Sequence, residues 1–252
     1  MIRHFIIMSS SYSKGVRIGL VFSGVEELNP DTISQVLQNI KRSCDQDVPL
    51  STHFIETESS SWDSIKQYDP FFEDVVFTHS VPEFIKEIRQ DRILSGLDVA
   101  TYILSKVKCT HLSLEKLVYY AYADYLCTYD QRLFEDSIYA FTHGPVVESV
   151  YETYKKSGLR YLEPLDKQPD SPLRFIENEM PGKSRILFAK DGAKKLASID
   201  KTIESYANCS AGELVKMTHR PSSPWSHVDN KKPYQVISDD LIKGYHHIET
   251  IL

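Results

Sequence analysis

The chain has 252 residues, of which 41% are hydrophobic and 25% charged, a composition typical of a globular protein with one large domain or two small ones. Its 29 basic and 35 acidic residues give a formal net charge of −6, and without a basic run it lacks the electrostatic footprint of nonspecific nucleic-acid binding. No apolar run approaches the roughly 18 residues of a membrane-spanning helix. We therefore expect a protein or small-molecule partner, with no membrane segment.

Residues 1 to about 92 alternate β-rich runs with helical patterns. Four short runs have the composition of strands and are bounded by Ser, Gly or other turn residues; they cover residues 4–8, 16–22, 53–56 and 74–78. The stretch between the last two runs is expected to be a loop with a short helical turn.

Two helices are expected in the same segment. Asn29 and Pro30 predict the start of the first, because Asn can cap a helix and Pro fits its first turn. Ser80 and Glu83 have the spacing of a capping box, which predicts the start of the second. The resulting order is ββαββα, an α+β module whose 9 basic and 14 acidic residues give it a net charge of −5.

From about residue 93 the pattern becomes helical. Apolar residues recur at helical spacing over residues 97–107 and again over residues 114–125, as on amphipathic helices. The second helix is apolar on nearly every face, which indicates the central helix of its domain. Its aromatic residues are expected to lie in the core with their hydroxyls directed to polar partners at its edge: Tyr119, Tyr120, Tyr122 and Tyr125.

The run from His143 to Val147 predicts a sharp start of another helix. Gly144 would cap this helix, and Pro145 would be its first helical residue. Gly158 would end it by adopting the left-handed conformation.

A proline-punctuated loop is expected over residues 164–172. Residues 174–177 and 185–188, on either side of a Pro-Gly pair, predict a small hairpin. Three further helices are expected after it: one from near Asp191 to Ala207, a short one opened by a capping box at Ser210 and running through Thr218, and a last one that starts at residues 238–240 and carries Tyr245.

Together these patterns predict an α+β protein with two parts. Residues 1–92 would form a small N-terminal accessory module with the order ββαββα, and residues 93–252 would form a mainly α-helical domain.

Standard catalytic and metal-binding signatures are missing from the sequence. It contains no phosphate-cradling glycine loop, no Gly-x-Ser-x-Gly elbow and no His-Glu-x-x-His motif. His219 and His227 lie eight residues apart, and His246 and His247 are adjacent; neither spacing is a recognised metal pattern. We therefore expect no enzymatic activity, no cofactor and no metal.

The compartment is predicted from the first residues and the cysteines. The opening apolar run is too short for the core of a signal peptide. The four cysteines lie far apart without a Cys-x-x-Cys pair, so neither a disulfide scaffold nor a cysteine-based zinc site is indicated. A cytoplasmic location is the expectation.

Four blocks of sequence follow one another over about residues 93–249. They read THLSLEKLVYYAYADYL at 110–126, FEDSIYAFTHGPVVESVY at 134–151, SAGEL with TH and PW between residues 210 and 225, and IKGY at 242–245. In this order and spacing they resemble the Panacea domain, the SocA-like antitoxin domain formerly catalogued as phage-associated. One difference is Phe141, where the family often has tryptophan.

The resemblance implies an antitoxin, which neutralises a cognate toxin encoded beside it, commonly by direct protein–protein binding. The founding type instead acts as a proteolytic adaptor that delivers its toxin to the ClpXP protease, and a phage- or prophage-associated regulatory protein is a further alternative. Residues 1–92 lie outside the resemblance. Their strands and negative charge do not favour DNA binding, so partner selection or formation of a homo-oligomer is the expected role.

The motif residues are candidates for the partner-binding site that the resemblance implies. Each also has a structural interpretation: a helix start would explain Gly144 and Pro145, Lys116 could stay solvated instead of pairing with the toxin, and Trp225 could act as a lid instead of a hot spot. His143 could cover helix amides or face a partner, and His219 suits the end of a helix. The full set is His111, Lys116, Tyr119, Tyr120, His143, Gly144, Pro145, Val146, His219, Pro224 and Trp225.

Overall fold

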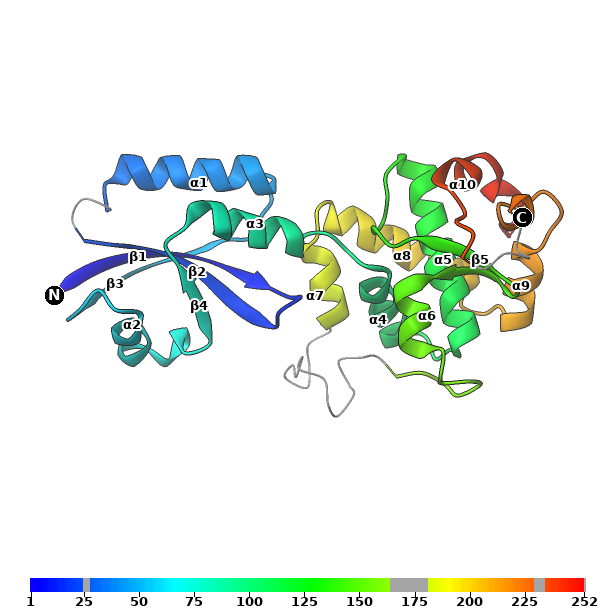
Figure 1. Ribbon diagram of the computed structural model, residues 1–252, viewed down its shortest axis with the longest axis horizontal. Helices are drawn as coiled ribbons and strands as arrows, with labels where there is room; N and C mark the ends of the chain where they lie inside the picture. The colour runs from blue at the N-terminus through cyan, green and yellow to red at the C-terminus, as the bar shows by residue number, and fades with distance from the viewer. Residues whose placement is uncertain (25–27, 164–180, 229–233, 252) are drawn as a thin grey trace. The chain divides into compact units, whose positions relative to one another are not determined.

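The computed structural model describes residues 1–24, 28–163, 181–228 and 234–251. The chain forms two compact units, Met1–Ile93 and Leu94–Leu252, which Figure 1 draws as ribbons. We call them the N-terminal unit and the helical unit. The first is built around a sheet and the second mainly from helices, so the α+β fold class predicted from the sequence is confirmed.

The N-terminal unit contains a four-stranded sheet in the order β3-β1-β2-β4. β1 is antiparallel to both β2 and β3, whereas β4 is parallel to β2. The four strands predicted from the sequence are confirmed, and β3 and β4 form the two edges of the sheet. Their bounds are Ile2–Ser11 for β1, Val16–Ser23 for β2, Ser51–Thr57 for β3 and Val75–Thr78 for β4.

Helices cover both faces of this sheet (Figure 1). α1 (Pro30–Cys44) and α3 (Val81–Asp91) lie on one face, where Ile40 and Phe84 pack with Ile7 of β1. α2 (Trp62–Tyr68) and a 3₁₀ turn over Pro70–Phe72 lie on the other face, which carries Ile6 and Met8 of β1. Adjacent residues of β1 thus serve opposite cores, as the alternation of side chains along a strand requires. The loop predicted before β4 contains a full α-helix, α2.

The helix starts of this unit follow the cap residues of the sequence. Asn29 Oδ1 accepts a hydrogen bond from the Asp31 amide at 2.8 Å, as a cap should. Ser80 accepts one from the Glu83 amide at 3.3 Å. The carboxylate of Glu83, however, accepts from the Thr78 hydroxyl, and the Ser80 amide donates to that same hydroxyl. The predicted capping box is therefore only half formed, because Thr78 replaces its second partner.

The helical unit is organised around α5 (His111–Tyr129), as the sequence predicted. All four tyrosines of the sequence prediction are buried. Helices pack around α5, and the hairpin described below lies against it. The surrounding helices are α4 (Gly96–Lys106), α6 (Glu148–Tyr154), α8 (Gly192–Tyr206), α9 (Ala211–Thr218) and α10 (Asp239–Tyr245), with α7 (Pro181–Phe188) packed on α4 and α8.

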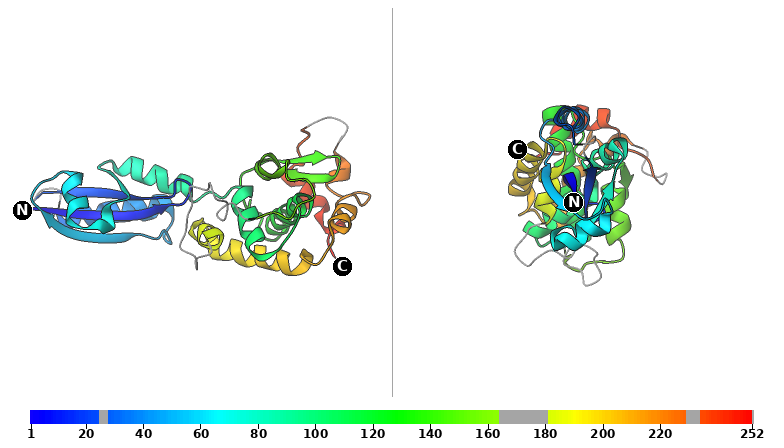
Figure 2. Two further views of the ribbon diagram at one scale, coloured as in Figure 1. Left: turned by 90° about the horizontal axis from the view of Figure 1, so that it is seen from below. Right: turned by 90° about the vertical axis from the view of Figure 1, so that its left-hand side faces the viewer.

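The run from residue 143 to 147 does not start a helix, so this prediction was wrong. β5 (Ile138–Phe141) and β6 (Gly144–Val147) form an antiparallel hairpin at the periphery of the unit (Figure 2), and α6 begins only at Glu148. Gly144 has a φ of 99°, the left-handed position that glycine takes in a short hairpin loop. A Gly-Pro pair suits both structures, and pairing with β5 selects the hairpin.

Two other predictions for this unit are corrected. Gly158 does adopt a left-handed φ of 58°, but it lies in a turn beyond the end of α6 at Tyr154. Residues 185–188 are not a strand, because they belong to α7, where Ile186 is fully buried. A Cβ at Gly182 would lie 3.1 Å from the backbone of Tyr102, so close packing on α4 favours the helix. Residues 164–172 and 174–177 lie outside the described residues.

The remaining helices of the unit are confirmed. The capping box at Ser210 and Glu213 is complete, and the Ser238 side chain caps α10. Among the described residues, no helix is both long and apolar enough to cross a membrane.

Candidate functional site

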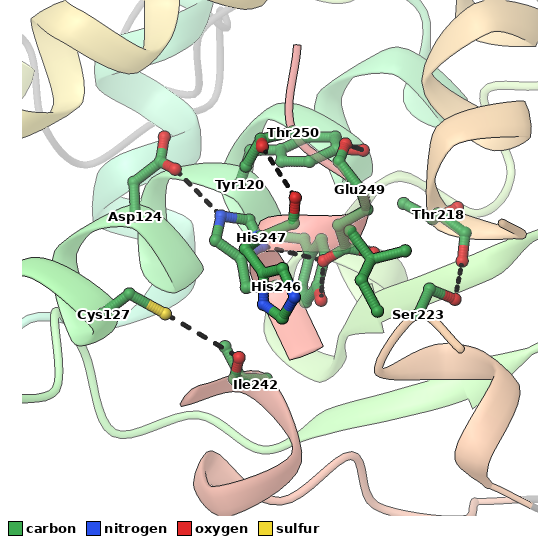
Figure 3. Close-up of polar contacts among 12 residues, drawn as sticks. Tyr120, Asp124, Cys127, Thr218, Ser223, Ile242, His246, His247, Glu249 and Thr250 are labelled. Atoms are coloured by element: carbon green, nitrogen blue, oxygen red, sulfur yellow. Dashed lines mark hydrogen bonds and ion pairs between the residues drawn. The ribbon is translucent and has the colours of Figure 1, made fainter. Parts of the chain in front are cut away.

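A group of buried polar side chains lies on α5 where residues 246–250 reach it. Glu249 is fully buried, and its Oε1 accepts hydrogen bonds from the Tyr119 hydroxyl and from Nδ1 of His246, the latter at 2.8 Å. The other ring nitrogen, Nε2, lies 2.9 Å from the Asp124 carboxylate. Figure 3 shows the contact of His246 with Asp124. Together with the buried Lys116, these residues are called the α5 polar core.

The charges of the α5 polar core determine its protonation. Burial by itself would lower the pKa of His246, but the hydrogen bonds and charges of Asp124 and Glu249 outweigh it and raise the pKa to about 9. The imidazole is therefore a cation between two carboxylates at neutral pH. Burial also raises the pKa of Glu249, whose Oε2 has no hydrogen-bond partner within the described ranges. His246 and Glu249 are thus held together by opposite charge, and both side chains are buried away from water.

Backbone contacts fix the 246–250 segment in the same place. The Tyr120 hydroxyl donates to the Glu249 carbonyl at 3.2 Å. Nη1 of Arg220, just after α9, donates to the carbonyls of Ile248 and Thr250 at 2.9 and 3.0 Å. The segment is thus bound from two sides, by α5 and by the residues that follow α9.

The neighbouring residues Glu115 and Lys116 of α5 hold strand β6. Oε2 of Glu115 accepts from the Val147 amide at 2.9 Å, and Nζ of Lys116 donates to the Pro145 carbonyl at 2.6 Å. Lys116 is fully buried, and burial lowers its pKa to about 8 against the attraction of Glu115 and Glu249. Lys116 is therefore not solvated, and it fixes the hairpin to the central helix.

Gly144 allows the close approach of the hairpin to α5 and α9. A Cβ at this position would lie 2.7 Å from Oγ1 of Thr218 and 3.1 Å from Nζ of Lys116. We expect Gly144→Ala to lower the free energy of unfolding of the helical unit by about 2–4 kcal/mol, because it combines this clash with an unfavourable φ. Urea denaturation monitored by circular dichroism measures the loss.

Gly158 provides the control for this substitution. Its φ is also positive, but no atom lies within 4 Å of the position of a Cβ. Gly158→Ala should therefore cost only about 1–2 kcal/mol, the backbone contribution alone. Equal losses for the two variants would contradict the close packing inferred at Gly144.

Two residues of the sequence motif join the segment after α9 to the hairpin. Nε1 of Trp225 donates to the Phe141 carbonyl at 2.8 Å, and Nε2 of His219 lies 3.2 Å from the Thr142 carbonyl. The two rings are in contact, with centroids 3.7 Å apart. Trp225 and His219 therefore support the hairpin loop from the side.

The motif residues divide by burial. The structure places Lys116, Tyr119, Tyr120, Gly144, Pro145, Val146 and Pro224 in the interior, whereas His111, His143, His219 and Trp225 are exposed in whole or in part. Gly144, Pro145 and Val146 belong to the hairpin and Lys116 holds it, whereas Tyr119 and Tyr120 bind Glu249. His143 is exposed in its loop, beside the partly exposed His219 and Trp225.

An aromatic surface lies on the outer side of the hairpin. The Phe141 ring lies 5.0 Å from Tyr151 of α6 and 5.6 Å from Tyr234, which also lies 5.6 Å from Tyr139. Tyr234 is 58% exposed, and the neighbouring Val236 is 52% exposed. We call Tyr139, Phe141, Tyr151 and Tyr234 the hairpin aromatic cluster. Aromatic side chains of this kind are enriched in protein–protein interfaces.

Several residues of the site were missed from the sequence. Asp124 lies in the first of the four sequence blocks but was not singled out, Arg220 and Glu249 carried no motif signal, and His246 was considered only as a metal ligand. The spacing of His246 and Glu249 suits contact on one helical turn, but nothing in the sequence brings them to α5. Among the described residues, no group of three or more His, Cys, Asp or Glu side chains is arranged to hold a metal ion.

Comparison with known families supports the same region. Residues 114–226 match the family model described as antitoxin SocA-like, Panacea domain. The match covers somewhat less than half of the chain; it includes most of α5, the hairpin and Trp225, and it confirms the resemblance predicted from the sequence. Neither the curated proteins nor the solved structures searched gave a match. The similarity supports a role of the toxin–antitoxin kind at the level of the family.

Proposed function

We propose that this protein is the antitoxin of a toxin–antitoxin pair and that it neutralises its cognate toxin by direct binding, without catalysis. The observation that carries this proposal is the match of residues 114–226 to the SocA-like antitoxin family model. The toxin would be encoded in a neighbouring gene.

We further propose the hairpin aromatic cluster, together with His143, as the toxin-binding surface. It consists of exposed or half-buried rings on a hairpin that Glu115 and Lys116 hold rigidly on α5. Rigid aromatic side chains bury much area at little cost in conformational entropy, and they are frequent hot spots. The buried motif residues would act by positioning this surface.

Co-expression tests the proposal directly. Each flanking gene is induced alone and together with the full chain, and growth is followed. We expect one flanking product to stop growth and this protein to restore it by forming a complex that remains intact on gel filtration. If neither product is toxic, or if rescue occurs while the two proteins elute separately with unchanged toxin levels, direct neutralisation is excluded.

A stability measurement of the toxin separates the adaptor alternative. Direct binding predicts that the toxin has the same half-life with and without this protein in cells that contain ClpXP. It also predicts that rescue persists in cells that lack ClpXP. Rescue that disappears in the protease-deficient strain would instead identify a proteolytic adaptor.

Within a confirmed pair, we expect Tyr234→Ala to weaken toxin binding about 30-fold or more. This corresponds to the loss of about 2 kcal/mol that is typical of an aromatic hot spot. Tyr129→Ala is the matched control, since Tyr129 is a 39% exposed tyrosine at the other end of α5 and its removal should change the Kd less than threefold. Isothermal titration calorimetry measures both, and equal Kd values for the two variants would reject this surface.

A further inference from the structure

A short loop after α6 carries exposed apolar and basic side chains. Leu159 is 90% exposed and Tyr161 is 72% exposed, and Lys156 and Arg160 are exposed beside them. Figure 1 shows the loop that follows α6 projecting from the helical unit. We call residues 155–161 the basic loop. Its apolar and cationic side chains offer the two kinds of contact that protein interfaces combine.

Backbone contacts hold the basic loop in place. Gly158 supplies a left-handed φ of 58°, and the Arg160 amide donates to the Ser157 carbonyl at 3.2 Å. The Leu162 amide donates to the Cys109 carbonyl at 3.0 Å, which ties the end of the loop to the residues between α4 and α5. The loop therefore presents its side chains from an anchored turn.

The charge around the basic loop is positive. Lys156 and Arg160 form no ion pair with any described residue, and the same holds for two exposed lysines that precede the anchor on the other strand of chain, Lys106 and Lys108. Residues 106–108 and 148–163 together contain five basic and three acidic residues, a net charge of +2. The whole helical unit has 20 basic and 21 acidic residues, so positive charge is concentrated here.

The basic loop adjoins the hairpin aromatic cluster. Nζ of Lys155 lies 5.8 Å from the centre of the Tyr151 ring, which belongs to that cluster. Tyr161 forms a β-bridge with Thr110, the residue before His111, whose ring centroid is 5.6 Å from that of Tyr151. The loop thus adds a basic margin to the aromatic surface.

An acidic protein surface fits this margin better than a nucleic acid or a lipid membrane does. The latter two are extended polyanions, and they would also face the acidic remainder of a chain with a net charge of −6. At physiological ionic strength charges are screened beyond about 8 Å, so a docked protein meets mainly the local positive charge. Arg160 suits a carboxylate, because a guanidinium can donate two parallel hydrogen bonds to it.

We propose that the basic loop and the hairpin aromatic cluster together bind an acidic, apolar face of the toxin, whose carboxylates pair with Lys156 and Arg160 and whose apolar side chains pack on Leu159. This inference rests on the proposed function, since it names the chemistry of the partner at the same surface. Charge pairs at the edge of an interface mainly accelerate association. The association rate constant should therefore fall as the ionic strength rises.

A peptide selection tests the chemistry of the surface without the toxin. Phage-displayed random linear peptides are selected on the full chain and, in parallel, on the double variant Lys156→Glu, Arg160→Glu. We expect the parent to enrich sequences that combine Asp or Glu with apolar residues, and the double variant to lose them. Enrichment of neutral or basic sequences by the parent, of the same acidic sequences by both baits, or of none at all would overturn the proposal.

Association kinetics test the proposal in a confirmed pair. Lys156→Glu and Arg160→Glu should each lower the association rate constant about tenfold at about 50 mM NaCl and much less at about 300 mM. Lys155 is a poorer probe because it is paired with Glu152. Lys201→Glu is the control, since Lys201 is exposed on α8 and its replacement changes the net charge equally; we expect a change of about twofold or less. Biolayer interferometry measures all three variants.

The outcomes separate this inference from the proposed function. A toxin that binds at a rate independent of salt and of Arg160 overturns the acidic face and leaves the antitoxin function intact. If neither flanking gene encodes a toxin, the antitoxin proposal fails, and the peptide selection still decides whether the surface binds acidic protein segments. Binding to vesicles of phosphatidylcholine and phosphatidylglycerol, or to a short DNA duplex, that Arg160→Glu abolishes would identify a polyanion as the occupant and overturn the proposal.

Discussion

Replacing Glu249 with alanine is expected to lower the free energy of unfolding of the helical unit by about 3–5 kcal/mol. Glu249 is fully buried and supplies a negative charge beside the cationic His246 and near Lys116. Its removal leaves these buried positive charges with less compensation and leaves the Tyr119 hydroxyl without its acceptor. Removing one partner of a buried pair costs more than the pair contributes, because the other charge stays desolvated.

The measurement requires a signal that comes from the helical unit alone. The chain has two tryptophans. In a Trp62→Phe background, urea denaturation monitored by tryptophan fluorescence therefore reports only on Trp225. Glu249→Gln keeps the shape and an acceptor but removes the charge, and we expect it to lose less than Glu249→Ala. Glu204→Ala, at an exposed position on α8, should change stability by less than about 0.5 kcal/mol. A loss below about 1 kcal/mol for Glu249→Ala would contradict the role of the α5 polar core.

The stability of the helical unit is expected to fall as the pH rises from about 6.5 to 8. The pKa of His246 is raised to about 9 in the folded protein from an ordinary value of 6.5, so the folded state holds this proton more tightly than the unfolded chain. Its contribution is complete below about pH 6.5 and is lost as the pH passes through 9. A difference of this size corresponds to about 2–4 kcal/mol.

Lys116 acts in the opposite direction at higher pH. Its pKa is lowered to about 8 from 10.5, so the unfolded chain binds this proton more tightly and stability rises between about pH 8 and 10.5. The steepest decline should therefore fall between pH 6.5 and 8. Urea denaturation at constant ionic strength at pH 6.5, 7.2, 8 and 9 measures it, and His246→Asn should flatten the curve. A wild-type stability that stays constant or increases from pH 6.5 to 8 would refute the assignment.

Features that depend on local sequence could be predicted correctly. α5 was identified as the central helix because it is apolar on nearly every face, and the four tyrosines predicted to lie in its core are buried. The starts of α1 and α9 followed from Asn29 and Ser210, whose side chains cap the helix amides directly. The contact that each cap makes lies within three residues of the capping side chain, so the local sequence contains it.

Features decided by contacts between distant segments could not be predicted in this way. Gly144 and Pro145 fit a helix start as well as a strand, and the choice depends on pairing with β5 and on the hydrogen bond from Lys116 to the Pro145 carbonyl. α7 packs on α4 and α8, and Gly182 lets it approach Tyr102 of α4 closely. Neither partner is indicated by the sequence around these residues.

The candidate site shows the same division. Lys116, Tyr119 and Tyr120 were singled out as motif residues, but their burial and their roles depend on partners elsewhere in the chain. Glu249, which accepts from Tyr119, lies 130 residues further along. The half-buried ring of Tyr139 and the exposed ring of Tyr234 gave no signal as a surface, because the cluster forms only when β5 and the residues near Val236 meet.

This separation in sequence has a consequence during synthesis on the ribosome. α5 is complete long before Glu249 has been translated, and at about 5–20 residues per second the interval is roughly 6–24 s. Throughout that time the hydroxyls of Tyr119 and Tyr120 lack the Glu249 groups that accept from them, whereas all strands of the N-terminal unit precede α5 in the chain. Nascent chains should therefore carry one finished unit and one unfinished, chaperone-accessible unit, so that premature termination before residue 246 yields a protein that cellular quality control removes.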